Sequence, residues 1–179
     1  MGHILKVKPV FKEMIWGGHK LKDVYGFDIP SDHTGECWAI SAHKNGDCTI
    51  SGGEFDGKTL SQLWQEHREL FGNIEGEEFP LLIKIIDACN DLSVQVHPND
   101  EYAKVHENSL GKTECWYVLG VDEGTQMVMG HHAKTKEELV KAIENDDYDN
   151  LLNKFPIKEG DFFYIPSGTI HAICSGSLI

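Results

Sequence analysis

The sequence has no hydrophobic run long enough to cross a membrane. None of its 179 residues falls in a stretch of about 18 apolar side chains, which is the length a transmembrane helix needs. The N-terminal stretch at 1–18 is also too charged and too interrupted for the apolar segment of a secretory signal. We therefore expect no membrane partner and a cytoplasmic location.

Positive charge is scarce. Sixteen Lys and Arg residues face 29 Asp and Glu residues, which gives a net charge of -13. A nucleic-acid partner or an anionic membrane surface would need a basic stripe, and both are excluded on this ground. If the ligand is instead a small anion, a few lysines must supply the positive potential locally.

Cysteine is present, but not in the pairs that mark a disulfide framework or a zinc finger. The five cysteines are an odd number, widely scattered and without a CxxC pair. This pattern is typical of reduced thiols in a cytoplasmic protein. No cysteine has neighbours that indicate a nucleophile.

Helical patterns are few, and no strand–helix–strand rhythm is visible. Capping boxes at Thr59 and Thr135 predict two helices, the first ending at Gly72, and 148–155 is a candidate for a short third helix. Trp38 and Trp64, like Trp116, are expected in the core. Strands separated by turn residues are predicted at 35–43, 81–88, 92–97, 114–121, 125–132, 161–166 and 169–176. A sandwich or a jelly roll with helical insertions fits this pattern, and without repeats or linkers we expect one domain over 1–179.

Four polar side chains interrupt strands that otherwise read as hydrophobic. Gln95 and His97 alternate with valines, so both lie on one face of their segment. Glu114 precedes an apolar run, and His171 stands between Ile170 and Ala172. Two imidazoles, a carboxylate and an amide suit Zn²⁺ or a similar divalent ion, and they leave positions for water or substrate.

The turn before His171 is the most specific of these signals. Gly160, Pro166, Gly168 and His171 have the spacing of the second cupin motif. Pro and Gly set a tight turn that aims the histidine back toward the interior of a barrel. A lone histidine on a strand is more often a hydrogen-bonded core residue, but the turn and the other polar segments favour a ligand here.

The first cupin motif is altered, because Gln95 replaces its first histidine and Glu114 lies 17 residues after His97. With this combination the chain resembles type I mannose-6-phosphate isomerase, the zinc-dependent phosphomannose isomerase, in its short bacterial form. The matching segments are "WGG" at 16–18, "GECWAIS" at 35–41, "FPLLIKIIDA" at 79–88, "LSVQVHPND" at 92–100, "GKTECWYVL" at 111–119 and "GDFFYIPSGTIHA" at 160–172. They occur in family order.

The resemblance implies a mainly β fold, a cupin-type jelly-roll β-barrel with a few helices packed on it. It implies one Zn²⁺ per chain, held by Gln95, His97, Glu114 and His171. It also implies an aldose–ketose isomerase that interconverts mannose 6-phosphate and fructose 6-phosphate through a cis-enediol(ate). The partner would be a small sugar phosphate, and the sequence carries no signal for an oligomeric state.

The same resemblance assigns roles to four further residues. Lys112 and Lys84 match active-site lysines, Ser93 matches a serine near the substrate phosphate, and Trp16 matches an aromatic residue near the pocket. Thr113 stands where the family usually has proline. Independently of the family, the ammonium of Lys84 lies among isoleucines and needs a partner.

Family members continue past the last zinc histidine into a second, smaller β domain that carries an active-site arginine. The expectation is that this domain is absent from the chain, whose apolar end "TIHAICSGSLI" has no polar punctuation after it. Two alternatives stay open. One is a non-catalytic phosphosugar-binding cupin, and the other is a different metal cupin such as an iron-dependent dioxygenase, which Gln95 disfavours.

Overall fold

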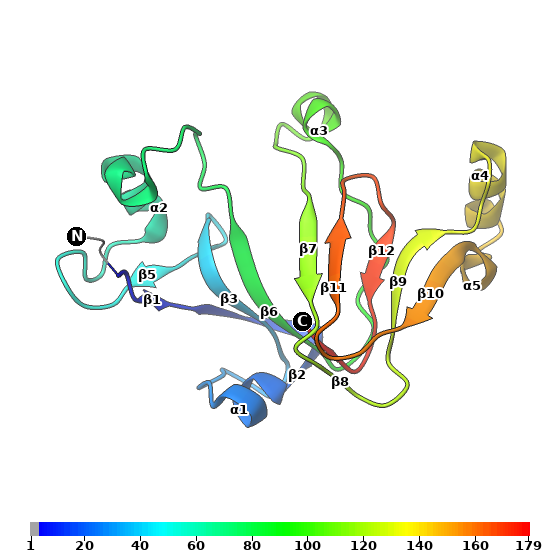
Figure 1. Ribbon diagram of the computed structural model, residues 1–179, viewed down its shortest axis with the longest axis horizontal. Coiled ribbons are helices and arrows are strands. Elements are labelled where there is room, and N and C mark those ends of the chain that lie inside the picture. Colours follow the sequence, from blue (N-terminus) through cyan, green and yellow to red (C-terminus); the bar gives the residue numbers. More distant parts are fainter. Residues whose placement is uncertain (1–3) are drawn as a thin grey trace. The chain divides into compact units, whose positions relative to one another are not determined.

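The computed structural model describes residues 4–179, so the first three residues of the N-terminal stretch lie outside it (Figure 1). The chain divides into two compact units, one ending at Asp87 and one running from Ala88 to Ile179. Dense internal contacts do not tell whether two units fold separately, so the single domain over 1–179 stays a prediction.

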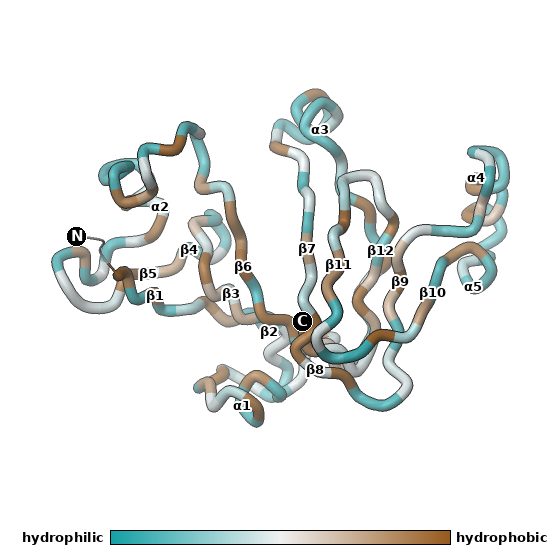
Figure 2. Tube along the Cα trace, viewed as in Figure 1, coloured by the Kyte–Doolittle hydropathy of each residue, from teal (hydrophilic) through white to brown (hydrophobic). Residues whose placement is uncertain are grey.

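The first unit is built around one long strand. Its elements are β1 (Val7–Lys8), β2 (Val10–Gly18), α1 (Lys20–Tyr25), β3 (Thr34–His43), β4 (Gly46–Asp47), β5 (Thr49–Ile50), α2 (Leu60–Glu66), the 3-10 turn η1 (Arg68–Phe71) and β6 (Leu82–Ala88). Strand β3 pairs antiparallel with β2, β4 and β6. Figure 2 shows hydrophobic colouring through most of β6, in agreement with the predicted strand at 81–88.

Helix α2 begins where the sequence predicts, but it ends at Glu66 and does not run on to Gly72 as one α-helix. Thr59 accepts a hydrogen bond from the N–H of Gln62, and the Gln62 side chain accepts one from the N–H of Thr59, which completes the capping box. The helix breaks at His67 and continues as η1, which ends at Gly72 in the left-handed conformation. The buried face of α2 contributes Leu63 to a hydrophobic cluster with Ile50 and Phe55. The partly buried residues around this cluster are Leu5, Val7, Leu70 and Phe71.

Two glycines let β2 and β3 approach closely beside Trp16. A Cβ on Gly35 would lie 2.5 Å from the Trp16 ring, and a Cβ on Gly17 would lie 2.4 Å from the Gly35 backbone nitrogen. Only glycine fits such a contact without moving the strands. The segments "WGG" and "GECW" therefore belong to one packing arrangement, which buries the Trp16 side chain.

The second unit is mainly β as well. Its elements are α3 (Asp100–His106), β7 (Glu114–Tyr117), β8 (Gly120–Val121), β9 (Gln126–His131), α4 (Lys136–Glu144), α5 (Tyr148–Leu151), β10 (Leu152–Pro156), β11 (Phe162–Ile165), β12 (His171–Ile173) and β13 (Ser177–Leu178). Strand β7 pairs with β11, β9 lies between β10 and β12, and β8 pairs with β13. Val128, Leu152 and Ala172 form the buried cluster of this sheet.

The mainly β class is confirmed, and the strands form several sheets of two to six strands; over residues 4–179 they do not close into one hydrogen-bonded barrel. Trp38, Trp64 and Trp116 are buried, as expected. None of the described helices is long and apolar enough to cross a membrane. The five cysteines are free thiols, as the scattered pattern predicts.

Two predicted elements are wrong. The segment 92–97 is extended, but it forms only a single bridge, at Gln95, in place of a full strand. The predicted helix at 148–155 ends after one turn, because Leu152 adopts extended dihedrals and opens β10 against β9. Pairing with a neighbouring strand thus overrides the local helical pattern.

Some elements gave no clear sequence signal. Helix α3 is capped by Asn99, whose side chain accepts a hydrogen bond from the N–H of Tyr102, but Ala103 is its only buried residue. With a single small side chain facing inward, no apolar periodicity marks the helix. Strand β2 and helix α1 were missed for the same lack of a regular pattern.

Replacing Thr59 with alanine removes the cap of a helix that buries Leu60, Leu63 and Trp64. We expect the free energy of unfolding to fall by about 1 kcal/mol. None of the α4 side chains, all of which are described, is buried. Thr135→Ala is therefore the control: Thr135 also accepts a hydrogen bond from a helix N–H, that of Glu138, but the Glu138 side chain accepts from Lys134, so the capping box predicted there is not completed. Its effect should stay below about 0.5 kcal/mol in urea unfolding followed by circular dichroism; equal losses would contradict the role given to burial.

Candidate metal centre

The backbone around Gln95 brings two of the predicted ligands together. Gln95 and His171 exchange both backbone hydrogen bonds, with N–O distances of 3.0 and 2.9 Å. Directly opposed residues in an antiparallel pair project their side chains from the same face. The amide of Gln95 and the imidazole of His171 therefore start from one face, and the Gln95 side chain is exposed.

The tight turn after β11 carries out the role that its spacing predicts. Glu114 opens β7 opposite Ile165, the last residue of β11. Pro166 follows, and Gly168 has a φ of 84° and donates its N–H to the carbonyl of His97 at 2.7 Å. The turn thus ties the chain before His171 to the segment that carries His97.

Three side chains converge as a result. Ligand atoms of His97, Glu114 and His171 all lie within 4.8 Å of one another, and they are the one such group of three among residues 4–179. The Nε2 atoms of His97 and His171 lie 3.4 Å from Glu114 Oε1 and Oε2 respectively. Exposed fractions of 19%, 17% and 1% show that a small ion can still reach the group.

The orientation of His171 is set by a backbone carbonyl. Its Nδ1 lies 2.8 Å from the carbonyl oxygen of Thr169, which can only accept, so Nδ1 carries the proton. In the neutral ring Nε2 then carries a lone pair and no proton. This atom is buried and has no hydrogen-bond partner within the described part of the chain.

Lys112 adds the one positive charge at this group. Its ammonium contacts Glu114 Oε1 and lies 3.2 Å from Nε2 of His97. An ammonium can only donate, so His97 also presents an Nε2 lone pair. The Lys112 side chain is 47% exposed.

This donor set fits a divalent cation. Two imidazole lone pairs and a carboxylate face one another. Because Nε2 of His171 carries no proton, it makes no hydrogen bond to the carboxylate of Glu114. Buried acceptors in this arrangement are favourable only when a cation neutralises them. An ion bound here would gain nitrogen and oxygen ligands of the kind that divalent metals take in proteins, with the Thr169 carbonyl holding the His171 ring.

The electrostatics keep His97 and Glu114 ready for a metal. Burial, together with the charge of Lys112, lowers the pKa of His97 below its ordinary value of 6.5. Burial raises the pKa of Glu114, but its hydrogen bond with Lys112 and the charge of that lysine lower the pKa by more, so the net pKa falls below 4.5. At neutral pH the imidazole is neutral and the carboxylate ionised, which are the states that bind metal.

Lys84 and Trp16 belong to the first unit, whereas Ser93 belongs to the second. The Lys84 ammonium donates to both oxygens of Glu36 at 3.0 and 3.2 Å, so the partner that its partly buried position demands is present. Ser93 is exposed and lies between Leu92, whose N–H donates to the Ile173 carbonyl, and Gln95.

Sequence reasoning missed the residues that support the ligands. Trp116 packs edge-on against His171, with ring centres 5.4 Å apart, although the sequence indicated only a core residue. Thr169 orients His171, and Glu36 holds Lys84. Glu36 stands in "GECW" beside a predicted core tryptophan, and a carboxylate there was a signal that could have been used.

Known proteins resemble this chain in sequence. The sequence profile of the family described as phosphomannose isomerase type I, catalytic domain, matches residues 4–117, which include Gln95, His97, Lys112 and Glu114 but not His171. Mannose-6-phosphate isomerase ManA of Bacillus subtilis is 58% identical over 172 residues, covering 96% of this chain and 54% of that protein. Mannose-6-phosphate isomerase of Streptococcus mutans is 54% identical over 179 residues, covering 100% of this chain and 57% of that protein.

A solved structure has the same fold as this chain. The crystal structure of mannose 6-phosphate isomerase from Bacillus subtilis superposes with a TM-score of 0.95 at 52% identity, covering 97% of this chain and 56% of that one. The cupin-type fold expected from the sequence is thereby confirmed. The chain spans little more than half the length of the curated relatives that it matches.

Removing either imidazole should abolish metal retention. We expect His97→Ala and His171→Ala to lower the affinity for a divalent ion by more than the roughly 10–100-fold that loss of an outer-shell partner costs. Lys112→Ala should keep the metal, because an ammonium cannot be a ligand. His106→Ala, at the exposed end of α3, is the matched control. Metal content after dialysis measures the effect, and full retention in both histidine variants would refute the ligand assignment.

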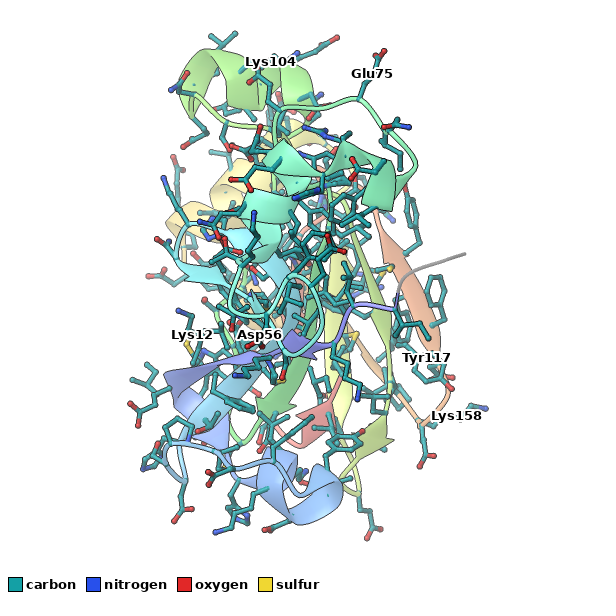
Figure 3. The ribbon with its side chains drawn as sticks, turned by 90° about the vertical axis from the view of Figure 1, so that its left-hand side faces the viewer. Lys12, Asp56, Glu75, Lys104, Tyr117 and Lys158 are labelled. Carbon is teal, nitrogen blue, oxygen red and sulfur yellow. The ribbon has the colours of Figure 1, made fainter. Side chains whose placement is uncertain are left out.

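Lys112 should also affect the pKa values of His97 and Glu114 in metal-free protein. Because its charge lowers the pKa of His97 and of Glu114, Lys112→Ala should raise both pKa values, which NMR titration of the ring and carboxyl signals can follow. Lys104→Ala, on α3 at the top of Figure 3, should leave both unchanged. A pKa of His97 that falls in Lys112→Ala would contradict this account.

The depressed pKa values also give the sign of the pH dependence of stability. The Glu114 carboxylate stabilises the metal-free fold above its unfolded value of 4.5, and this stabilisation is lost as pH falls through the lower folded value. His97 has no effect above its unfolded value of 6.5 and destabilises the fold increasingly as pH falls below it.

Proposed function

The chain belongs to the type I phosphomannose isomerase family, and from this premise we propose that its activity is the reversible isomerisation of mannose 6-phosphate and fructose 6-phosphate. The observation that carries the proposal is the convergence of His97, Glu114 and His171 around the buried lone pair of His171. A nearby lysine, Lys112, whose side chain is 47% exposed, completes a site suited to an anionic, oxygen-rich substrate.

We propose one Zn²⁺ per chain, held by Gln95, His97, Glu114 and His171. Nitrogen and oxygen ligands in this number are typical of zinc, and four protein ligands leave room for substrate. With a single carboxylate among them, the centre keeps a net positive charge. When bound, the metal supplies Lewis-acid stabilisation of the negative charge that develops on substrate oxygen in an aldose–ketose isomerisation.

The residues of the chain have separate tasks in this proposal. Thr169 and Trp116 keep the His171 ring in one orientation, so the ligand set does not have to rearrange. Gln95 contributes a neutral oxygen and so preserves the positive charge of the centre. Lys112 presents an ammonium, which can donate to a substrate oxygen that becomes anionic during the reaction.

Lys84 is proposed as a second catalytic lysine, with Ser93 and Trp16 as substrate-binding residues; the family resemblance supports these roles. A protein with a net charge of -13 repels a sugar phosphate at long range, so its lysines must attract the substrate locally. Both proposed catalytic lysines are paired with a glutamate, which sets their positions before the substrate arrives. We also propose a cytoplasmic location, consistent with five free thiols.

A coupled assay on the full-length natural protein tests the function. We expect fructose 6-phosphate to form mannose 6-phosphate and the reverse, with activity lost on chelation and restored by Zn²⁺. Lys112→Ala should keep zinc but lower kcat/KM by about 100-fold or more, since an electrostatic contact to the developing charge is lost. Lys104→Ala is the control on the exposed face of α3.

The alternatives give different results in the same experiment. Tight sugar-phosphate binding without any turnover would indicate a non-catalytic binding protein. Fe²⁺ in anaerobically purified protein, together with oxygen consumption, would indicate a dioxygenase. Either outcome would refute the isomerase.

A further inference from the structure

The partner of Lys84 is itself held by a third side chain, and all three come from the face of one strand pair. Trp38 of β3 lies directly opposite Lys84 of β6 in the antiparallel register. Glu36 is two residues before Trp38 on β3, so alternation places it on the same face. The three side chains therefore meet without any loop between them.

Glu36 is a buried carboxylate that accepts hydrogen bonds from the other two side chains of this group. The residue is only 8% exposed. Its Oε1 lies 3.0 Å from the Lys84 ammonium and its Oε2 lies 3.2 Å from it, so one donor group bridges both oxygens. A carboxylate this deep is tolerable only because the cation and a further donor satisfy it.

That further donor is Trp38. Its indole N–H donates to Glu36 Oε2 at 2.6 Å, which fixes the rotation of the carboxylate. The Lys84 ammonium also lies 4.9 Å from the centre of the Trp38 ring, within range of a cation–π contact. The tryptophan thus holds Lys84 in two ways, through the carboxylate and through its own ring.

The Trp38 ring in turn has little freedom to move. A Cβ on Gly46 would lie 2.7 Å from the ring, so only glycine leaves room for it there. Lys12 of β2, labelled in Figure 3, places its ammonium 4.9 Å from the ring centre and donates to the Asn45 carbonyl. The ring is 8% exposed and accordingly well packed.

From this arrangement we propose that Glu36 and Trp38 are positioning residues for Lys84. They hold its ammonium in one place, so that the flexible side chain does not have to be ordered when the substrate binds. The Lys84 side chain remains 23% exposed, and an ammonium has three donors, so it can still reach an anionic ligand. The inference rests on the proposed function, because it gives a reason for Lys84 to be fixed.

A double-mutant cycle on the full-length, zinc-loaded protein tests the proposal. Glu36→Gln keeps the shape of the side chain but removes the charge that holds Lys84, and Trp38→Phe keeps an aromatic side chain, though a smaller one, and removes the indole N–H. Each should lower kcat/KM by about 10-fold to 100-fold, the size of effect that follows from misplacing an active group. In a Lys84→Ala background, the same changes should cost less than about twofold further, because they act only through Lys84.

Matched controls exist in the same unit. Trp64→Phe removes an indole N–H that donates to the Glu77 carbonyl at 3.3 Å, and Glu66→Gln removes a carboxylate paired with Lys58 at the surface. Both residues lie on α2, outside the group of Glu36, Trp38 and Lys84, and both variants should retain kcat/KM within about twofold. If Glu36→Gln fails to fold, Trp38→Phe carries the test alone.

A second measurement separates this inference from the proposed function. Labelling of Lys84 by an amine-reactive reagent, read by peptide mass spectrometry, should be several-fold faster in Glu36→Gln and Trp38→Phe than in wild type or in the controls. Wild-type protein without isomerase turnover would reject the proposed function, while labelling would still decide whether Glu36 and Trp38 hold Lys84. Unchanged labelling, or equal fold losses of kcat/KM with and without Lys84, would overturn the inference.

Discussion

The constraint on which the second unit depends is the orientation of the His171 ring. One backbone carbonyl takes the proton on Nδ1, and the remaining lone pair is buried facing a carboxylate. Electron pairs facing one another in a partly buried place repel unless a cation lies among them. The tight turn at 166–168, the backbone pairing of Gln95 with His171 and the edge of Trp116 all serve to maintain this orientation. The metal centre is therefore a consequence of backbone geometry more than of the ligands taken singly.

Each unit contains a lysine paired with a glutamate. In a chain with a net charge of -13, the proposed site for a phosphorylated sugar needs fixed positive groups. Lys112 is paired with Glu114 and Lys84 with Glu36. The first pair is more exposed and lies at the metal ligands, whereas the second is nearly buried and is held by Trp38. Pairing reduces the charge of each lysine at long range but sets where its ammonium stands, and position is what a catalytic contact requires.

Local patterns failed where tertiary pairing decided the backbone. The segment 92–97 alternates as a strand does, yet it makes one bridge, because its partner β12 covers only His171–Ile173. The segment 148–155 reads as a helix, yet Leu152 begins a strand against β9. In both places the hydrophobic pattern is compatible with both the predicted and the observed backbone. Pairing with the neighbouring strand decides which of the two forms. The capping box at Thr59, by contrast, is a local interaction and was predicted correctly.

The sequence by itself determined the mainly β class, the family and the identity of the candidate ligands. The reason is that turn residues and polar residues within apolar segments form patterns over a few consecutive positions, which can be read without a structure. It also showed that Lys84 needs a partner, since an ammonium among isoleucines cannot stay unpaired. Only the tertiary structure decided that the partner is Glu36, that Trp38 fixes this carboxylate, and that Nε2 of His171 is the free lone pair. These facts depend on distances between strands 48 residues apart or on the direction of a single carbonyl, and no local pattern in a chain encodes them.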